Sequence, residues 1–177
     1  AQNIGYTGVS SNTCGLAPSG DPSLLYGSKW STLLHINSDG SGSVDVGGVG
    51  MEGTAYDSVT GTLYGSINGD FFTIDESTGE VVTILASPGA DVEGMAFGRG
   101  GVFGIAGFNA GFNSDLLWYD PAADTWQTLG DTGVNWDKCG LAYDPIEDVL
   151  FAKGNQDSFL YRIDPDTATT TIVGDTG

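Results

Sequence analysis

The chain has 177 residues, and its 5 basic against 23 acidic residues give a net charge of −18. Phosphate-rich partners would be repelled over their whole approach, so nucleic acid and anionic membrane surfaces are excluded as ligands. No apolar run approaches the ~20 residues that a membrane-spanning helix needs. The 29 glycines, together with abundant Ser and Thr, predict short strands joined by many tight turns.

Four repeats follow one another along the chain at intervals of about 40 residues, and each contains four short apolar segments typical of strands. In the first repeat, about 10–48, these are 14–18, 25–27, 33–37 and 43–46. In the second, about 49–89, they are 52–57, 63–65, 71–75 and 81–85. In the third, about 90–133, they are 93–98, 102–104, 116–120 and 126–129. In the fourth, about 134–177, they are 139–144, 150–152, 160–164 and 170–173.

The repeat predicts the fold class. Four antiparallel strands joined by short turns form one twisted sheet, and a sheet of this kind must pack against its neighbours. An open array would leave two apolar end faces exposed, so closure into a ring is favoured. We therefore expect an all-β protein in which residues 1–177 form a single four-bladed β-propeller, with four antiparallel strands in each blade.

The repeat pattern resembles that of bacterial extracellular β-propeller repeat proteins. The likeness rests on a first strand such as Gly140-Leu141-Ala142-Tyr143-Asp144, a second such as Leu63-Tyr64-Gly65, and a third that ends in Asp-Pro or Asp followed by a turn. It covers nearly the whole chain. One stretch, 119–126, is also weakly similar to a kelch blade, but the Gly-Gly doublet of kelch repeats is missing. The resemblance implies a fold, and because propellers of this kind have many binding roles it does not imply one function.

The only two cysteines, Cys14 and Cys139, occupy the same position in the first and last repeats. In a closed ring of four blades these repeats are neighbours, so we expect a disulfide between them. It would stabilise the fold by roughly 4–5 kcal/mol in the chain-entropy model and would indicate an oxidising, secreted location. Hemopexin-like propellers share this architecture and tie first blade to last in the same way. The alternative is two buried free thiols.

One segment does not fit four repeats. Residues 2–9 are similar to residues 127–134, the outer strand of the third repeat and the link that follows it. The segment is either an inherited loop or a sign of a longer array or of a ring built from two chains. A monomer is favoured, and a dimer that forms a larger ring is the rival. The first residues, Ala1-Gln2, suit a mature secreted protein from which a signal peptide has been removed.

One face of the ring should carry the loops between second and third strands and the links between blades. Amides and carboxylates in these loops suit sugar hydroxyls and hard cations, and aromatic rings suit the apolar faces of sugars. The longest loop, 106–115, carries two phenylalanines, Phe108 and Phe112. Long loops often carry function. The predicted binding residues are Trp30, Asn68, Asp70, Phe108, Asn109, Asn113, Asp115, Trp136, Asp137, Asn155 and Asp157.

Glu52 and Glu93 occupy, in the two middle repeats, the position that the cysteines hold in the outer ones. Two converging carboxylates there would bind calcium or another cation, whereas the plainer interpretation is that both are solvated or bonded to backbone amides. We predict no catalytic residue. His35 is the sole histidine and lies at a variable strand position, so neither a Ser-His-Asp triad nor a zinc site is supported.

The sequence therefore predicts a secreted, non-enzymatic binding module that recognises carbohydrate or an extracellular protein through one loop face. Two alternatives remain open. A glycan-active enzyme needs only a pair of carboxylates at the right separation, which a sequence cannot measure. A structural repeat domain of a larger surface protein needs no ligand site at all.

Overall fold

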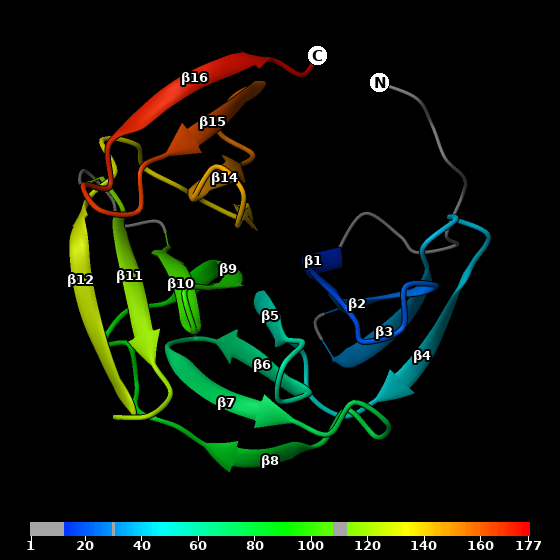
Figure 1. Cartoon of the computed structure of the whole chain (residues 1–177). Coiled ribbons are helices and arrows are strands. Elements are labelled where there is room, and N and C mark those ends of the chain that lie inside the picture. The colour runs from blue at the N-terminus through cyan, green and yellow to red at the C-terminus, as the bar shows by residue number, and fades with distance from the viewer. Residues whose placement is uncertain (1–12, 30, 108–112) are drawn as a thin grey trace.

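The computed structural model describes residues 13–29, 31–107 and 113–177. Sixteen strands and no helix occur within these residues, and the strands form four sheets of four antiparallel strands each. Figure 1 shows the sheets arranged as blades around a common axis. The predicted all-β class and the propeller of four blades are confirmed.

Each blade is built in chain order from the axis outward. Blade 1 contains β1 (Thr13–Pro18), β2 (Leu24–Lys29), β3 (Thr32–Asn37) and β4 (Ser43–Gly47). Blade 2 contains β5 (Gly53–Asp57), β6 (Thr62–Ile67), β7 (Asp70–Ile74) and β8 (Val81–Ile84). Blade 3 contains β9 (Val92–Gly98), β10 (Gly101–Ala106), β11 (Asp115–Asp120) and β12 (Thr125–Asp131). Blade 4 contains β13 (Gly140–Asp144), β14 (Val149–Lys153), β15 (Phe159–Ile163) and β16 (Thr170–Asp175).

Aspartates close many of the strand turns. The Asp75, Asp120, Asp144 and Asp164 carboxylates each accept a backbone N–H from the residue two positions later, at 2.8 Å. This is the Asx turn, in which a short carboxylate replaces a backbone acceptor and fixes the bend. Much of the acidic excess of the chain is therefore used in its turns.

Three apolar clusters lie between successive blades. Leu33 of blade 1 packs with Tyr56 and Phe72 of blade 2 in the first cluster, and Phe71 of blade 2 packs with Tyr119 of blade 3 in the second. The third cluster joins blade 3 to blade 4 and includes Phe103, Leu116, Trp136, Leu150 and Ile163. Because strand side chains alternate between the two sides of a sheet, each middle blade contributes to both of its neighbours.

Blades 1 and 4 do not share such a cluster within the described residues. β1 packs extensively on β5, β5 on β9 and β9 on β13, whereas β1 meets β13 only marginally near the axis. Figure 1 shows blades 1 and 4 at the two ends of an arc. The expected tight closure between first and last blades is therefore not made by this part of the chain.

The predicted Cys14–Cys139 disulfide is not formed, because Cys139 is a free and buried thiol. The reason is the direction of β13, which faces blade 3. The Cys139 thiol lies so close to Gly94 of β9 that a Cβ at this glycine would be 2.8 Å from the sulfur. Burial strongly raises the pKa of the Cys139 thiol, and the nearby Glu93 raises it further.

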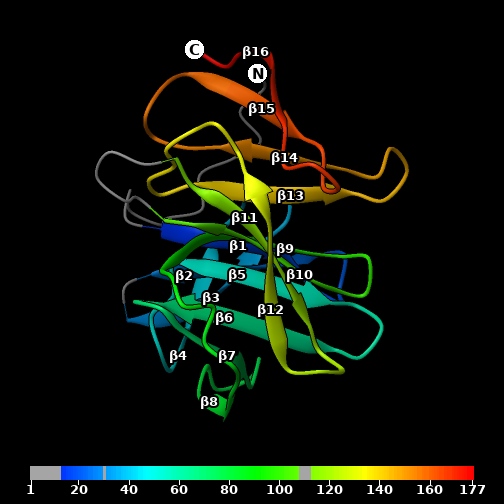
Figure 2. The same ribbon diagram turned by 90° about the vertical axis from the view of Figure 1, so that its left-hand side faces the viewer.

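The ring has two faces, which lie on opposite sides of the blades in Figure 2. The loop face carries the connections from second to third strands and the links from one blade to the next. The turn face carries the turns between first and second strands and between third and fourth strands. No helix in the described chain is long and apolar enough to cross a membrane.

Candidate functional site

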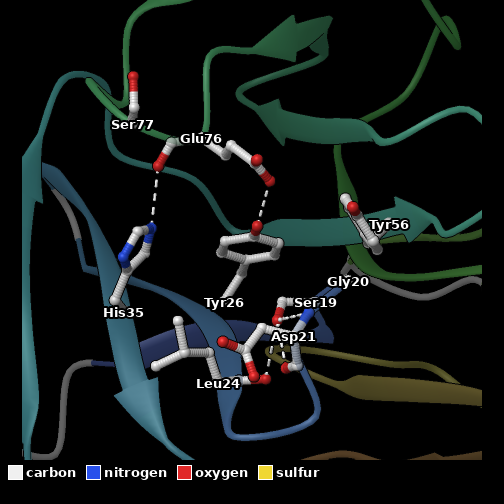
Figure 3. Close-up of a pocket in the computed structure, with 9 residues that line it drawn as sticks. All are labelled: Ser19, Gly20, Asp21, Leu24, Tyr26, His35, Tyr56, Glu76 and Ser77. Atoms are coloured by element: carbon white, nitrogen blue, oxygen red, sulfur yellow. Dashed lines mark hydrogen bonds between the residues drawn. The ribbon is translucent and has the colours of Figure 1, made fainter.

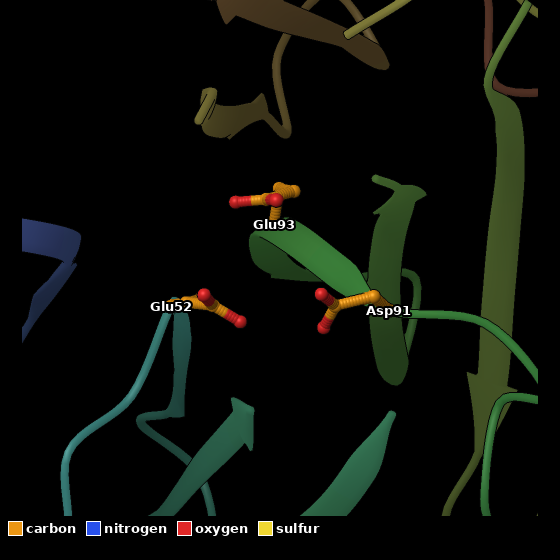
Figure 4. Close-up of side chains that lie close together, drawn as sticks. All are labelled: Glu52, Asp91 and Glu93. Atoms are coloured by element: carbon orange, nitrogen blue, oxygen red, sulfur yellow. The ribbon is translucent and has the colours of Figure 1, made fainter. Parts of the chain in front are cut away.

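Three carboxylates meet at the axial end of the loop face. Glu52 lies immediately before β5, Asp91 immediately before β9, and Glu93 within β9. Carboxylate oxygens of all three lie within 4.8 Å of one another. Figure 4 shows the Glu52 and Asp91 side chains reaching toward each other from two blades, with Glu93 above them. We call these three residues the acidic mouth.

The backbone around the acidic mouth orients its carboxylates. The loop between β6 and β7 turns through two residues of positive φ, Asn68 (52°) and Gly69 (82°). This turn directs the Asn68 N–H to Glu52 at 3.4 Å and the Gly69 N–H to Asp91 at 3.2 Å. Gly107 is required for space, because a Cβ there would lie 2.7 Å from Cγ of Glu93. Blade 2 thus holds two of the carboxylates, and the end of β10 leaves room for the third.

The acidic mouth carries more negative charge than its surroundings compensate. The pKa of Glu93 is raised to about 7, first by burial and then by the charges of Glu52, Asp91 and Asp137, in that order. The pKa of Glu52 is also raised, first by burial and then by Asp91. Lys138 lowers both pKa values without reversing either shift. A cation placed between these carboxylates would remove the repulsion.

The sequence placed Glu52 and Glu93 at the same end of the channel, and the structure brings them together. Sequence reasoning missed Asp91 as their partner in a cation site. The signal was available, because Asp91 and Glu93 are two positions apart in an extended segment and therefore project to the same side. The structure contains no ion, so calcium binding stays a prediction.

Several other predicted binding residues use their polar groups within the fold. The Asn113 amide donates to Asp131 and the Asn155 amide to Asp137, each at 3.2 Å. The Asp157 carboxylate accepts the Tyr161 hydroxyl at 2.6 Å and the backbone N–H of Phe159 at 2.9 Å. Asp70 and Asp115 begin β7 and β11 at the loop face. None of these side chains belongs to the group of three carboxylates, although Asp137, the partner of Asn155, is near enough to raise the pKa of Glu93.

The structure removes Trp136 from the predicted binding set. This indole is fully buried between blades 3 and 4, where its Nε1–H donates to Thr132 Oγ1 at 3.0 Å. It therefore offers no flat surface to a sugar ring. Three further predicted binding residues, Trp30, Phe108 and Asn109, lie outside the described residues, and so does the repeat-like segment 2–9.

A pocket of about 360 Å³, which the sequence did not indicate, opens on the turn face between blades 1 and 2. Figure 3 shows Glu76 above it, accepting the Tyr26 hydroxyl on its carboxylate. The backbone carbonyl of Glu76 lies 2.9 Å from Nε2 of His35. The histidine of blade 1 thus contacts the turn between β7 and β8 of blade 2.

The turn face also holds two salt bridges that share one arginine. Arg99, in the turn between β9 and β10, donates to Asp148 at 2.6 Å and to Asp166 at 2.5 Å, joining blade 3 to blade 4. Hydrogen bonds from Arg99 and Tyr143 lower the pKa of Asp148 to about 2. We call Arg99, Asp148 and Asp166 the arginine clasp.

No protein-family model matches this chain, and no curated protein matches its sequence. Solved structures do match in fold. A chain of a nidogen/laminin complex aligns with a TM-score of 0.69 at 15% identity, over 93% of this chain and 65% of the other. A Bacteroides thetaiotaomicron VPI-5482 protein of unknown function gives 0.64 at 12% identity, over 97% of this chain and 49% of the other.

Kuenenia stuttgartiensis hydrazine synthase gives a TM-score of 0.61 at 14% identity, over 93% of this chain and 48% of the other. At such identities the likenesses show the propeller fold alone. This chain spans between about half and two-thirds of the length of the structures that it matches.

Proposed function

We propose that this chain is a secreted, non-enzymatic binding module that recognises an extracellular protein through the loop face, with the acidic mouth receiving a cationic group of the partner. The propeller fold supports a binding or repeat module in general. The observation that carries the finer proposal is the convergence of Glu52, Asp91 and Glu93 within 4.8 Å at the centre of this face. Such a site gains from any cation that relieves its repulsion.

A protein partner is favoured over a carbohydrate by the position of Trp136. Flat aromatic surfaces beside polar groups suit sugar rings, and Trp136, the one predicted aromatic binding residue within the described chain, is buried in the core instead. One of the fold neighbours comes from a complex between two proteins, nidogen and laminin, which supports partnering with protein. Carbohydrate remains the alternative ligand, and a glycan array tests it.

Calcium is a second candidate for the same mouth. Calcium takes six to eight oxygen ligands from carboxylates, backbone carbonyls and water, and three carboxylates so close together supply a large share of such a shell. A bound calcium would also serve as a bridge to an acidic or carbonyl group of a partner.

A glycan-active enzyme is disfavoured but has one point of support. A pKa of about 7 for Glu93 suits a general acid. Two pockets of about 360 Å³ are, however, lined by turn-face residues, Glu76 in one and Arg99 and Asp166 in the other, whereas Glu93 belongs to the loop face of blade 3 and lines neither. A turnover assay on the glycans that bind would decide this alternative.

The test uses calorimetric titration with two probes, calcium chloride and a short oligolysine peptide, at neutral pH. We expect saturable binding of at least one probe by the wild type and a loss of at least tenfold in affinity in Glu52→Gln. The matched control is Asp70→Asn, which removes one negative charge from the same face outside the acidic mouth. If both variants weaken binding equally, the attraction is due to net charge alone and the proposed site is wrong.

A further inference from the structure

In blades 1 to 3, we call the side of the sheet that packs on the next blade its outward face; in blade 4 the outward face is the equivalent side. The outward face of blade 4 differs from those of the other blades, although it is built from the same repeat positions. Tyr26, Tyr64 and Phe103 occupy one position in blades 1 to 3, with exposures of 5%, 5% and 0%. Each of these rings packs against an aromatic ring at the first strand of the following blade, with centroids 5.3 to 6.4 Å apart. In blade 4 the same position is Phe151, which is only partly buried.

Two other positions show the same difference. Ala17, Ala55 and Ala96 are buried in the first strands of blades 1 to 3, whereas Ala142 of blade 4 is exposed. In the third strands, Leu33, Phe71 and Leu116 are completely buried, whereas Leu160 is only partly so. Blade 4 therefore presents an interface surface that no following blade covers in the described chain.

A Ser and Thr pair that forms hydrogen bonds to a residue of the next blade also recurs, and we call such a pair a socket. In blade 3, Thr132 N and Oγ1 both donate to the Ser114 carbonyl. The two side chains then receive Trp136 of blade 4: its backbone N–H donates to Ser114 Oγ and its indole N–H to Thr132 Oγ1, each at 3.0 Å. This tryptophan is the largest fully buried side chain in the interface between blades 3 and 4.

Blade 4 has the same pair, Ser158 and Thr176. Thr176 N and Oγ1 both donate to the Ser158 carbonyl, as Thr132 N and Oγ1 do to that of Ser114. The sequence Gly-Asp-Thr-Gly of 174–177 repeats that of 130–133. Ser114 and Thr132 are buried beneath the tryptophan, whereas Thr176 is exposed and Ser158, bonded to the Asp175 carboxylate, is partly exposed.

We infer that the outward face of blade 4 is a docking face for a further blade of this repeat, which seats a tryptophan between Ser158 and Thr176. The face continues the pattern of the three built interfaces, and the socket specifies the incoming residue. Segment 2–9, whose sequence is similar to the outer strand of the third repeat, agrees with a further copy of the repeat.

A second copy of this chain fits less well. Its blade 1 would have to cover Phe151 with the side of the sheet that points away from blade 2. Leu34 and Ile36 lie on that side, since they alternate with Leu33, and they are already 0% and 6% exposed. Blade 1 therefore does not offer the open counterpart that a head-to-tail ring of two chains requires.

The experiment extends the chain after Gly177 with a second copy of residues 134–177, which supplies a blade with its own tryptophan and the same linker sequence. Phe151→Ala is then measured in the original and in the extended chain, with Phe103→Ala as the reference for a covered position. We expect Phe151→Ala to lower Tm by no more than about 3 °C in the original chain and by roughly 10 °C in the extended one.

The matched control is the same extension with the tryptophan of the added copy replaced by alanine, which should remove most of this coupling. Thr176→Val should lower Tm only in the extended chain. The inference is overturned if Phe151→Ala has the same small effect in both chains. It is also overturned if light scattering shows that the original chain forms dimers and Phe151 is buried in them, because a second copy would then be the occupant.

Discussion

The two faces of the propeller treat carboxylates in opposite ways. On the turn face, the arginine clasp places one guanidinium between Asp148 and Asp166, and the pKa of Asp148 falls to about 2. On the loop face, the acidic mouth brings three carboxylates together, and the pKa of Glu93 rises to about 7. The same chemical group is thus stabilised as an anion on one face and penalised on the other.

The difference shows where the chain compensates its carboxylates with a cation of its own and where it does not. The clasp uses an internal cation to join blades 3 and 4 and needs nothing else. The mouth has one lysine nearby, Lys138, whose effect is smaller than the combined repulsion. A fold that leaves repulsion at one place while removing it at another marks that place as a candidate for function.

The largest effect is expected from the interface between blades 3 and 4, which the arginine clasp also spans. Trp136→Ala removes a fully buried indole and its hydrogen bond to Thr132, and should lower the free energy of unfolding by about 3–5 kcal/mol. Chemical denaturation measures this loss. Trp126→Ala is the comparison, since this partly buried indole joins blades 2 and 3 through the Ala86 carbonyl. An equal or smaller loss in Trp136→Ala would contradict the account of the interface.

The acidic mouth should make the protein less stable as pH rises. The folded pKa of Glu93 lies at about 7, above its ordinary value of 4.5, so the folded state binds more protons between these values. The free energy of unfolding should therefore fall from pH 4.5 to pH 7, by about 1–2 kcal/mol for this half-buried group once solvent screening is allowed for. Glu93→Gln should remove most of this fall, with the remainder due to Glu52, whose pKa is also raised, and Asp70→Asn should preserve it.

The arginine clasp should act at lower pH and in the opposite direction. The pKa of Asp148 is depressed from 3.8 to about 2, so its contribution to stability is complete above pH 3.8 and is lost as pH falls toward 2. Asp148→Asn should remove this acid-sensitive component while leaving the fall between pH 4.5 and 7 intact. Thermal melts at closely spaced pH values separate the two regions, and a single shared slope would show that they are not distinct.

The smallest effect is expected from reduction. Because Cys139 is a free thiol facing Gly94, a reducing agent should leave Tm unchanged. The thiol should also react with a thiol reagent only after unfolding, since it is buried. A mass of the intact chain lower by two hydrogens without reductant would reveal an intramolecular disulfide and restore the original prediction.

The fold could be predicted from the sequence because the repeat is local and redundant. Four copies of an Ala paired with an aromatic residue in the next strand, as in Ala55 and Tyr64, fix the strand pairing and the side of the sheet that packs on the following blade. Ring closure could not be predicted, because it depends on the angle between blades, which no repeat position encodes. The disulfide prediction failed for this reason, since it assumed that blades 1 and 4 are neighbours.

The candidate site was predicted in part. The shared repeat position of Glu52 and Glu93 placed both at one end of the axis, because equivalent residues of a ring converge there. The burial of Trp136 was not foreseen. Its place in an inter-blade link suggested an exposed loop residue, whereas the Ser114 and Thr132 socket that draws it inward comes from the preceding blade.

The measurement that tests the central proposal most directly is an NMR titration of the Glu93 side-chain carboxyl with and without a cation. The acidic mouth predicts a pKa of about 7 without a cation, and a fall of that pKa when calcium or oligolysine binds. A pKa close to 4.5 that neither probe moves would show that the three carboxylates do not act as one site, and the proposed function would be wrong.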